Sequence, residues 1–146
     1  MSSPVIIEKT FAAPVEKVWK ALTSSDQMKQ WYFDIPGFRP EVGYEFQFTG
    51  VGKTGEKFVH LCKVLEVVTN KKLKHSWRYK GYQGDSFVTF ELFPEGDGTR
   101  VKLTHDGLET FPVTAHDDFA KENFEAGWNH IIGKGLGEHL NDLKTG

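Results

Sequence analysis

The chain has 146 residues and a formal net charge of −2 at neutral pH. This length fits one domain, which we place at residues 1–146, and the charge balance lacks the basic excess that nucleic acids or anionic membranes attract. A single cysteine, Cys62, excludes an internal disulfide framework and is typical of the reducing cytoplasm. Residues 1–4 lack signal-peptide features, and no apolar run reaches the roughly eighteen residues of a membrane span, so we expect a cytoplasmic location.

The first third of the sequence predicts one strand and two short helices. Val5–Phe11 is rich in β-branched and aromatic residues, as strands are. Proline at the start of residues 14–22, followed by apolar residues at helical spacing, predicts a short helix. Residues 23–26 offer N-cap side chains for a second short helix that carries Met28, Trp31 and Tyr32. The prolines and glycines that follow, in residues 34–43, predict a loop.

Alternating hydrophobicity then predicts five further strands. They are expected at residues 44–49, 58–68, 73–79, 88–92 and 101–105. The alternation is imperfect around Lys63, which leaves open a bulge or burial on both faces. Short connections, such as the turn expected at residues 94–98, favour a mostly antiparallel meander of about six strands.

The last thirty residues change to a helical pattern. Apolar residues recur every four positions, which predicts one long amphipathic helix over residues 115–143, with Asp117 and Asp118 suited to its N-terminal dipole. Glycines disfavour a helix interior, yet Gly127 and Gly135 lie on its apolar face. Either the helix is kinked or closely packed there, or these glycines leave room for a ligand.

The sequence offers few catalytic or metal-binding motifs. Residues 50–55 have the spacing G-x-G-x-x-G, but a predicted strand follows instead of a helix, so we expect a hairpin turn. His60 and Cys62 share a strand face without an apparent third ligand, so we expect no metal and no cofactor. His75 and His105 fall on apolar strand faces. They are either core histidines with satisfied rings or polar groups that orient a ligand in a pocket.

Several sequence blocks resemble the START-like (SRPBCC) superfamily. Residues 11–23, FAAPVEKVWKALT, are similar to its opening block, and Trp31 matches the tryptophan that closes its second helix. Residues 98–105, GTRVKLTH, and the pair Gly127-Trp128 resemble its last two blocks. Together they resemble the branch of homologues of the activator of the ninety-kilodalton heat-shock-protein ATPase (AHSA-like). The resemblance implies an α+β helix-grip fold: a curved antiparallel sheet of about six strands around a long C-terminal helix, with two short helices after the first strand.

The resemblance also implies a cavity between the sheet and the last helix. Members of the superfamily bind lipids, sterols, aromatic polyketides or plant hormones there, and a few are cyclases or hydrolases. An aromatic fraction of 14% fits such a cavity, because aromatic rings supply large flat walls. The candidate ligand-binding residues lie on the predicted inward faces of strands and helix: Tyr44, Phe46, Phe48, His75, Trp77, Tyr79, Phe90, Leu103, His105, Phe124, Trp128, Ile131 and Ile132.

We therefore expect a monomeric binding protein for a small hydrophobic or aromatic ligand, of lipid, polyketide or flavonoid type. One alternative is a cyclase- or hydrolase-type enzyme that uses His75, His105 or Tyr79 in the same pocket. A second alternative is an interaction module that stimulates a chaperone ATPase, since the branch is named for such a cochaperone. That module would need an exposed apolar or charged patch for its chaperone partner.

Overall fold

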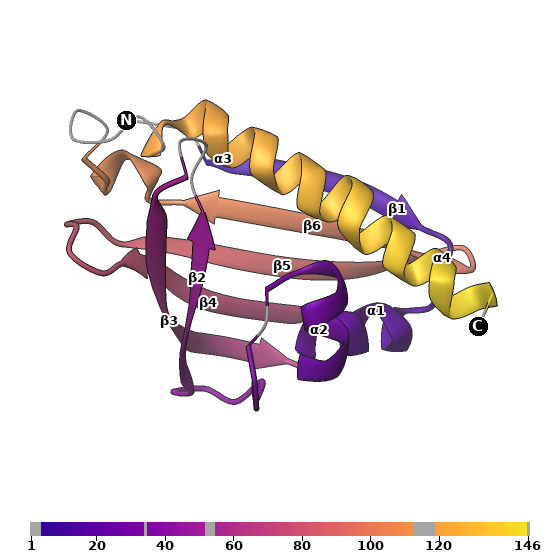
Figure 1. Cartoon of the computed structure of the whole chain (residues 1–146). Coiled ribbons are helices and arrows are strands. Elements are labelled where there is room, and N and C mark those ends of the chain that lie inside the picture. Colours follow the sequence, from indigo (N-terminus) through magenta and orange to yellow (C-terminus); the bar gives the residue numbers. More distant parts are fainter. Residues whose placement is uncertain (1–3, 34, 52–54, 113–118, 146) are drawn as a thin grey trace.

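The computed structural model describes residues 4–33, 35–51, 55–112 and 119–145. They form a six-stranded antiparallel sheet with a long C-terminal helix packed across it (Figure 1). The strands are β1 (Val5–Phe11), β2 (Glu45–Val51), β3 (Lys57–Val68), β4 (Lys72–Tyr79), β5 (Ser86–Glu95) and β6 (Gly98–Asp106). The helices are α1 (Val15–Thr23), α2 (Ser25–Trp31), the 3-10 turn η1 (Leu108–Thr110), α3 (Lys121–Trp128), η3 (Asn129–Leu136) and α4 (Gly137–Thr145).

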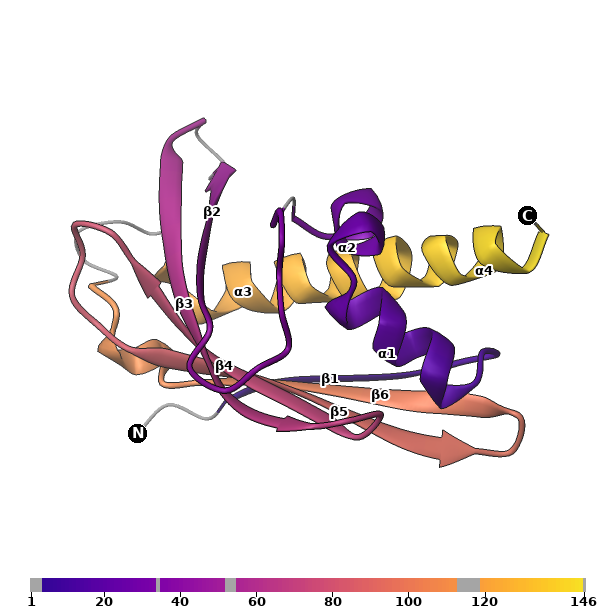
Figure 2. The same cartoon turned by 90° about the horizontal axis from the view of Figure 1, so that it is seen from below.

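The sheet has the order β1-β6-β5-β4-β3-β2, so the first strand pairs with the last. Val5 lies opposite His105 in this pairing, and Phe11 lies opposite Thr99. Figure 2 shows that β2 and β3 rise away from the rest of the sheet, and that α1, α2 and the C-terminal helix lie on its concave side. This is the helix-grip α+β fold that the sequence predicted.

All six predicted strands are present, with small differences at their ends. The turn expected at residues 94–98 is shorter, because β5 continues through Glu95 and β6 begins at Gly98. The expected irregularity in β3 is confirmed slightly further along the strand, where the register with β4 shifts between Val64 and Glu66. Beside this shift, the backbone N–H of Lys63 donates to Ser76 Oγ at 3.0 Å, so a side chain of β4 accepts this hydrogen bond in place of a backbone carbonyl.

The long C-terminal helix that the sequence predicted over residues 115–143 is confirmed in its described part, which runs from Lys121 to Thr145 with Ala120 as its N-cap. Residues 115–118, with Asp117 and Asp118, lie outside the described residues. The stretch Asn129–Leu136 is π-helical. The four-residue apolar repeat is consistent with this, since four residues overshoot an α-helical turn of 3.6 and fit a helix that is partly π-helical.

The core lies between the inner strand faces and the helix. Alternate residues of β6, including Val101 and Leu103, are fully buried, as are Ile132 and Leu136 of η3. Burying each such aliphatic side chain contributes about 1.5–3 kcal/mol to stability. On the concave side of the sheet, Trp31 Nε1–H donates to the carbonyl of Ala21 at 2.9 Å and fixes α2 to α1. Across the described residues, no helix has the length and apolar character needed to cross a membrane.

Candidate ligand-binding site

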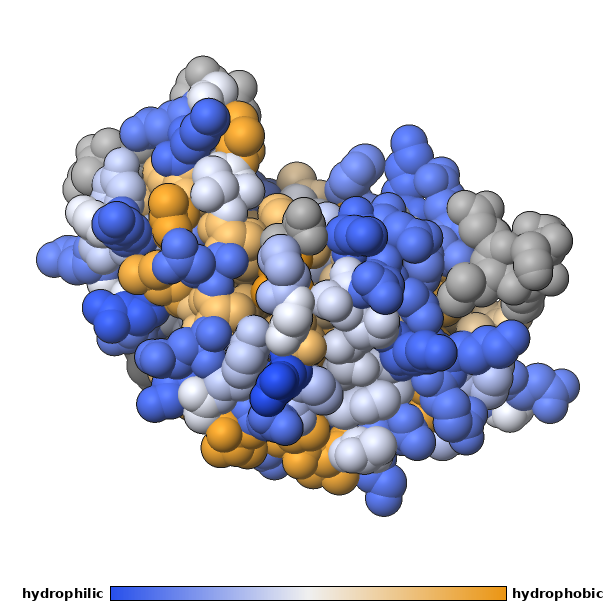
Figure 3. All heavy atoms as spheres, turned by 60° about the horizontal axis from the view of Figure 1, so that its bottom comes forward, coloured by the Kyte–Doolittle hydropathy of each residue, from blue (hydrophilic) through white to orange (hydrophobic). Residues whose placement is uncertain are grey.

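A cavity of about 300 Å³ lies between the raised part of the sheet and helix α3. Its walls are mainly aromatic and aliphatic, and they consist of Phe33, Gly50, Val51, Phe58, His60, Trp77, Tyr79, Phe119, Asn123, Phe124, Gly127, Trp128 and Ile131. In the space-filling view, hydrophobic atoms gather on the side of the molecule where β2 and β3 lie, whereas hydrophilic atoms dominate around α1 and α2 (Figure 3). The cavity is therefore suited to an apolar ligand.

A larger hollow of about 860 Å³ lies elsewhere, between the start of α1 and the β3–β4 and β5–β6 turns. Its lining mixes apolar residues such as Val68 and Phe93 with five charged ones, among them Lys71 and Lys72. The guanidinium of Arg100 already covers the ring of Phe93, 4.4 Å from its centroid. This hollow is the poorer match for a flat apolar ligand, although it is the larger of the two.

Phe48 packs behind one wall of the aromatic cavity, against the lining rings of Phe33 and His60. Phe33 stacks on Phe48 with ring centroids 4.2 Å apart, and Phe48 stacks on His60 at 4.5 Å. The rings of Trp77 and Trp128, from β4 and α3, meet at 5.5 Å. Such contacts between aromatic rings stabilise beyond their buried area and hold the flat walls in place.

A buried hydrogen-bond chain connects the two tryptophans. Trp128 Nε1–H donates to His105 Nδ1 at 3.0 Å, so Nδ1 is unprotonated and the neutral ring carries its proton on Nε2. His105 Nε2 donates to Ser86 Oγ at 2.8 Å, and the Ser86 hydroxyl donates to the carbonyl of Trp77 at 2.7 Å. Trp77 Nε1–H in turn donates to the Tyr79 hydroxyl at 2.9 Å. The chain fixes the orientation of both tryptophan side chains.

Burial keeps the three inner histidines uncharged. It lowers the pKa of His105 to about 3, with further lowering from His75 and His60. Burial also lowers the pKa of His60 and that of His75 to about 4, each partly offset by backbone hydrogen bonds. A general base works best with a pKa near the ambient pH, so these rings are weak bases at neutral pH.

One buried polar group within the described residues has no hydrogen-bond partner, the hydroxyl of Tyr32. The Tyr32 ring borders a separate internal void of about 10 Å³ and stacks on Trp128 with centroids 6.2 Å apart. Burial raises the pKa of Tyr32 well above its usual value, so the hydroxyl stays protonated at neutral pH. An unsatisfied buried hydroxyl costs about 1–3 kcal/mol.

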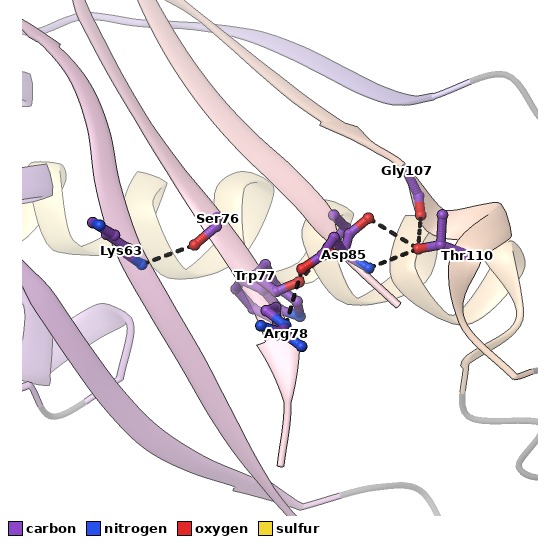
Figure 4. A network of polar contacts seen from close by, with 8 residues as sticks. Lys63, Ser76, Trp77, Arg78, Asp85, Gly107 and Thr110 are labelled. Carbon is purple, nitrogen blue, oxygen red and sulfur yellow. Dashed lines mark hydrogen bonds and ion pairs between the residues drawn. The ribbon is translucent and has the colours of Figure 1, made fainter. Parts of the chain in front are cut away.

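Polar contacts join Thr110 of η1 to Asp85 and Gly107 (Figure 4). Thr110 Oγ1 accepts from the backbone N–H of Asp85 and lies 2.7 Å from the carbonyl of Gly107. Gly107 has a φ of 82°, and a Cβ there would come within 2.6 Å of the Asp85 carbonyl, so only glycine fits. These contacts position Phe111, whose ring packs on Tyr79 with centroids 5.1 Å apart.

The candidate residues from the sequence separate into four groups. Those that line the cavity are Trp77, Tyr79, Phe124, Trp128 and Ile131. Those that pack behind its walls or in the core are Phe48, Leu103, His105 and Ile132. Those that border a separate internal void of about 10 Å³ are Phe46, His75 and Phe90. Tyr44 lies further away, where its hydroxyl donates to the carbonyl of Gly37.

The sequence analysis missed part of the lining. Phe58 and His60 share the buried face of β3 with Cys62 and Val64, so the period-2 pattern could have identified them. Phe33 and Phe119 lie outside the strands and α-helices, where no periodicity marks them. His75 fits the interpretation as a core histidine, since its Nδ1 donates to the Ser76 carbonyl at 2.8 Å.

The two glycines of the helix have different surroundings. Gly127 lines the cavity, and a Cβ added there would meet nothing within 4 Å. A Cβ at Gly135 would lie 3.0 Å from the Trp31 carbonyl, so this glycine permits close packing of η3 on α2. Gly52, Lys53 and Thr54 of the glycine-rich turn lie outside the described residues, whereas the flanking segments are the paired strands β2 and β3.

The described residues contain no group of three or more side chains that could hold a metal ion. His116 lies outside the described residues, whereas the other five histidines of the sequence lie within them. His60 and Cys62 lie on the same strand face, as expected, and both are buried.

Comparisons with known proteins agree with this architecture. The model of the family described as "Activator of Hsp90 ATPase homolog 1-like protein" matches residues 12–141. Protein MLL2253 from Mesorhizobium loti is 28% identical, with a TM-score of 0.78 over 95% of this chain and 97% of that one. CalU16 from Micromonospora echinospora is 26% identical, with a TM-score of 0.71 over 92% and 72%. CV1439 from Chromobacterium violaceum, 21% identical with a TM-score of 0.78 over 94% and 96%, shares the fold. No curated protein matches.

Proposed function

The chain belongs to the Activator of Hsp90 ATPase homolog 1-like family, and from this premise we propose that it binds a small hydrophobic or aromatic ligand. The ligand, of lipid, polyketide or flavonoid type, occupies the cavity between the sheet and α3. We further propose that the protein acts as a cytoplasmic monomer. The START-like fold supports this proposal, because proteins that share it typically bind hydrophobic ligands.

The observation that carries the proposal is the lining of the cavity. Seven of its thirteen described residues are phenylalanine, tryptophan or tyrosine, and none of the thirteen is aspartate, glutamate, lysine or arginine. Flat aromatic walls with a few uncharged polar groups favour a flat apolar molecule that is oriented by one or two hydrogen bonds. The Trp77 and Trp128 side chains, whose indole N–H groups donate to Tyr79 and His105, make the site largely pre-formed, which reduces the entropy lost on binding.

A cyclase- or hydrolase-type reaction in the same cavity has less support. Both ring nitrogens of His105 are engaged in the chain between the tryptophans, and His75 borders a different void. The pKa values of about 3 and about 4 make these histidines weak bases at neutral pH. The structure offers no specific observation, within the described residues, that favours a chaperone-stimulating surface.

The proposal is tested by titrating a flat aromatic fluorophore into the wild type and two variants. Trp128→Ala removes a cavity wall and is expected to weaken binding at least tenfold. The control is Phe93→Ala, which removes an aromatic ring from the outer hollow and leaves the cavity intact. Both variants are first checked for cooperative unfolding. Equal affinity of the wild type and Trp128→Ala, or a loss confined to Phe93→Ala, would contradict the cavity as the binding site.

A further inference from the structure

The ring of His60 is held in the cavity wall by four aromatic rings. Phe48 stacks on it with centroids 4.5 Å apart, and Trp77 and Tyr79 meet it in T-shaped contacts at 4.8 and 4.7 Å. Phe33 lies further away, at 6.0 Å. Gly50 lies against the Cε1 edge, where an added Cβ would come within 2.8 Å. The ring is therefore locked in one orientation before any ligand arrives.

The hydrogen bond of this ring decides its tautomer. The carbonyl oxygen of Phe58 lies 3.0 Å from His60 Nδ1, and a carbonyl oxygen can only accept, so Nδ1 carries the proton. A neutral imidazole has one N–H, which leaves Nε2 with a lone pair. The ring stays neutral in the physiological range, because burial lowers the pKa of His60 to about 4.

We propose that His60 Nε2 is the hydrogen-bond acceptor of the site, and that the ligand is an uncharged aromatic molecule with a hydroxyl or N–H donor. This inference rests on the proposed function and specifies the chemistry of its ligand. His60 is one of the lining residues, and the Phe58 carbonyl already engages its Nδ1, so Nε2 is the ring nitrogen left to accept a hydrogen bond from a ligand.

The same lining disfavours an anionic ligand. No described lining residue carries a lysine or arginine side chain, and the neutral His60 ring offers a lone pair instead of a positive charge. A buried carboxylate without a cationic partner loses its hydration and gains no compensating interaction. A phenol, in contrast, keeps its hydrogen bond by donating to Nε2 while its ring packs against the aromatic walls.

The test compares three naphthalene probes of similar size at neutral pH. 2-Naphthol has a donor, 2-methoxynaphthalene has only an acceptor, and 2-naphthoate is an anion. One neutral hydrogen bond corresponds to a preference of about threefold to tenfold, so the wild type is expected to bind 2-naphthol tighter than 2-methoxynaphthalene by this factor. It is expected to bind 2-naphthoate most weakly.

The variant His60→Phe keeps a ring on Phe48 and removes the acceptor. It is expected to bind 2-naphthol and 2-methoxynaphthalene equally, with the affinity for 2-methoxynaphthalene changed less than threefold. The control His130→Phe alters an exposed histidine outside the cavity and should keep the wild-type preference. A second measurement uses the wild type alone: the ¹⁵N resonance of His60 Nε2 should shift with 2-naphthol and stay in place with 2-methoxynaphthalene.

The outcomes separate this inference from the proposed function. If no probe binds the wild type, the proposed function fails and the inference fails with it. If the probes bind without a preference for 2-naphthol, if the preference survives in His60→Phe, or if the His60 Nε2 resonance does not respond to 2-naphthol, then the inference is wrong while the cavity remains a binding site.

Discussion

The indole N–H of Trp128 on α3 donates to Nδ1 of His105 on β6, 3.0 Å away in the buried interior. This bond joins the C-terminal helix to the sheet at the cavity, and it holds one orientation of the Trp128 side chain. It also selects the His105 tautomer that donates to Ser86, which in turn fixes the backbone of Trp77. His105 thus acts on the cavity from behind its wall, where it cannot touch a ligand.

The variant His105→Leu is expected to lower the free energy of unfolding by about 1–3 kcal/mol, because it leaves the buried Trp128 N–H without an acceptor. Urea unfolding monitored by circular dichroism measures this change. In the double variant His105→Leu/Trp128→Phe the orphaned donor is gone. Its loss of unfolding free energy should therefore be smaller than the sum of the losses in the two single variants. If the free-energy losses of the two single variants add exactly, the hydrogen bond between Trp128 and His105 contributes nothing to stability.

The variant Tyr32→Phe is expected to raise the free energy of unfolding, by about 1 kcal/mol, since it removes a buried hydroxyl that has no partner within the described residues. The ring and its stacking on Trp128 are retained. The matched control is Tyr44→Phe, which loses a hydroxyl that donates to the Gly37 carbonyl and should be neutral or destabilising. A loss of stability in Tyr32→Phe would mean that its hydroxyl has a partner.

Stability should fall as the pH falls below about 6.5. The pKa values of His60, His75 and His105 lie at about 4, about 4 and about 3 in the folded protein, whereas histidines of an unfolded chain titrate near 6.5. Below pH 6.5 the unfolded state therefore binds more protons, and each histidine lowers the free energy of unfolding by about 1.4 kcal/mol per pH unit down to its folded pKa.

Urea unfolding at several values between about pH 7.5 and pH 5 measures this slope. The variant His75→Phe removes one of the three histidines with a lowered pKa and should reduce their contribution to the slope by roughly a third. His130→Gln, at an exposed position, is the control and should leave it unchanged. Stability that is constant over this interval would contradict the assignment of neutral buried histidines.

Two glycines of the C-terminal helix should respond in opposite ways to alanine. Gly127→Ala is expected to stabilise the protein by about 0.5–1 kcal/mol, since alanine favours the helix and the added Cβ meets nothing within 4 Å. Gly135→Ala should destabilise it, because its Cβ would press on the Trp31 carbonyl at 3.0 Å. Thermal unfolding of the pair measures both effects, and equal shifts in one direction would refute the distinction.

The sheet was predictable because its strands have one buried face. Leu73, His75 and Trp77 alternate with exposed or half-buried residues, and a period of two is a strong local signal. The resemblance to START-like proteins added the expectation that the sheet curves around the last helix. The π-helical stretch could not be predicted, because apolar spacing alone does not distinguish a widened helix from a straight one.

The site was predictable in part, for the same reason. Trp77, Tyr79 and Trp128 were found because they lie on periodic faces that point to the centre of the fold. Which inward residues line the cavity and which fill the core depends on the curvature of the sheet, and no local pattern encodes that. His75 and Phe90 accordingly border a separate void, whereas Phe33 reaches the cavity from beyond the end of α2.

The most direct test of ligand binding between the sheet and α3 is a two-dimensional amide NMR titration of the labelled wild type with 2-naphthol. We predict that the shift changes cluster on α3 around Trp128 and on the strands that carry His60 and Trp77. Changes confined to the outer hollow near Phe93, or none at saturating probe, would contradict this placement of the binding site.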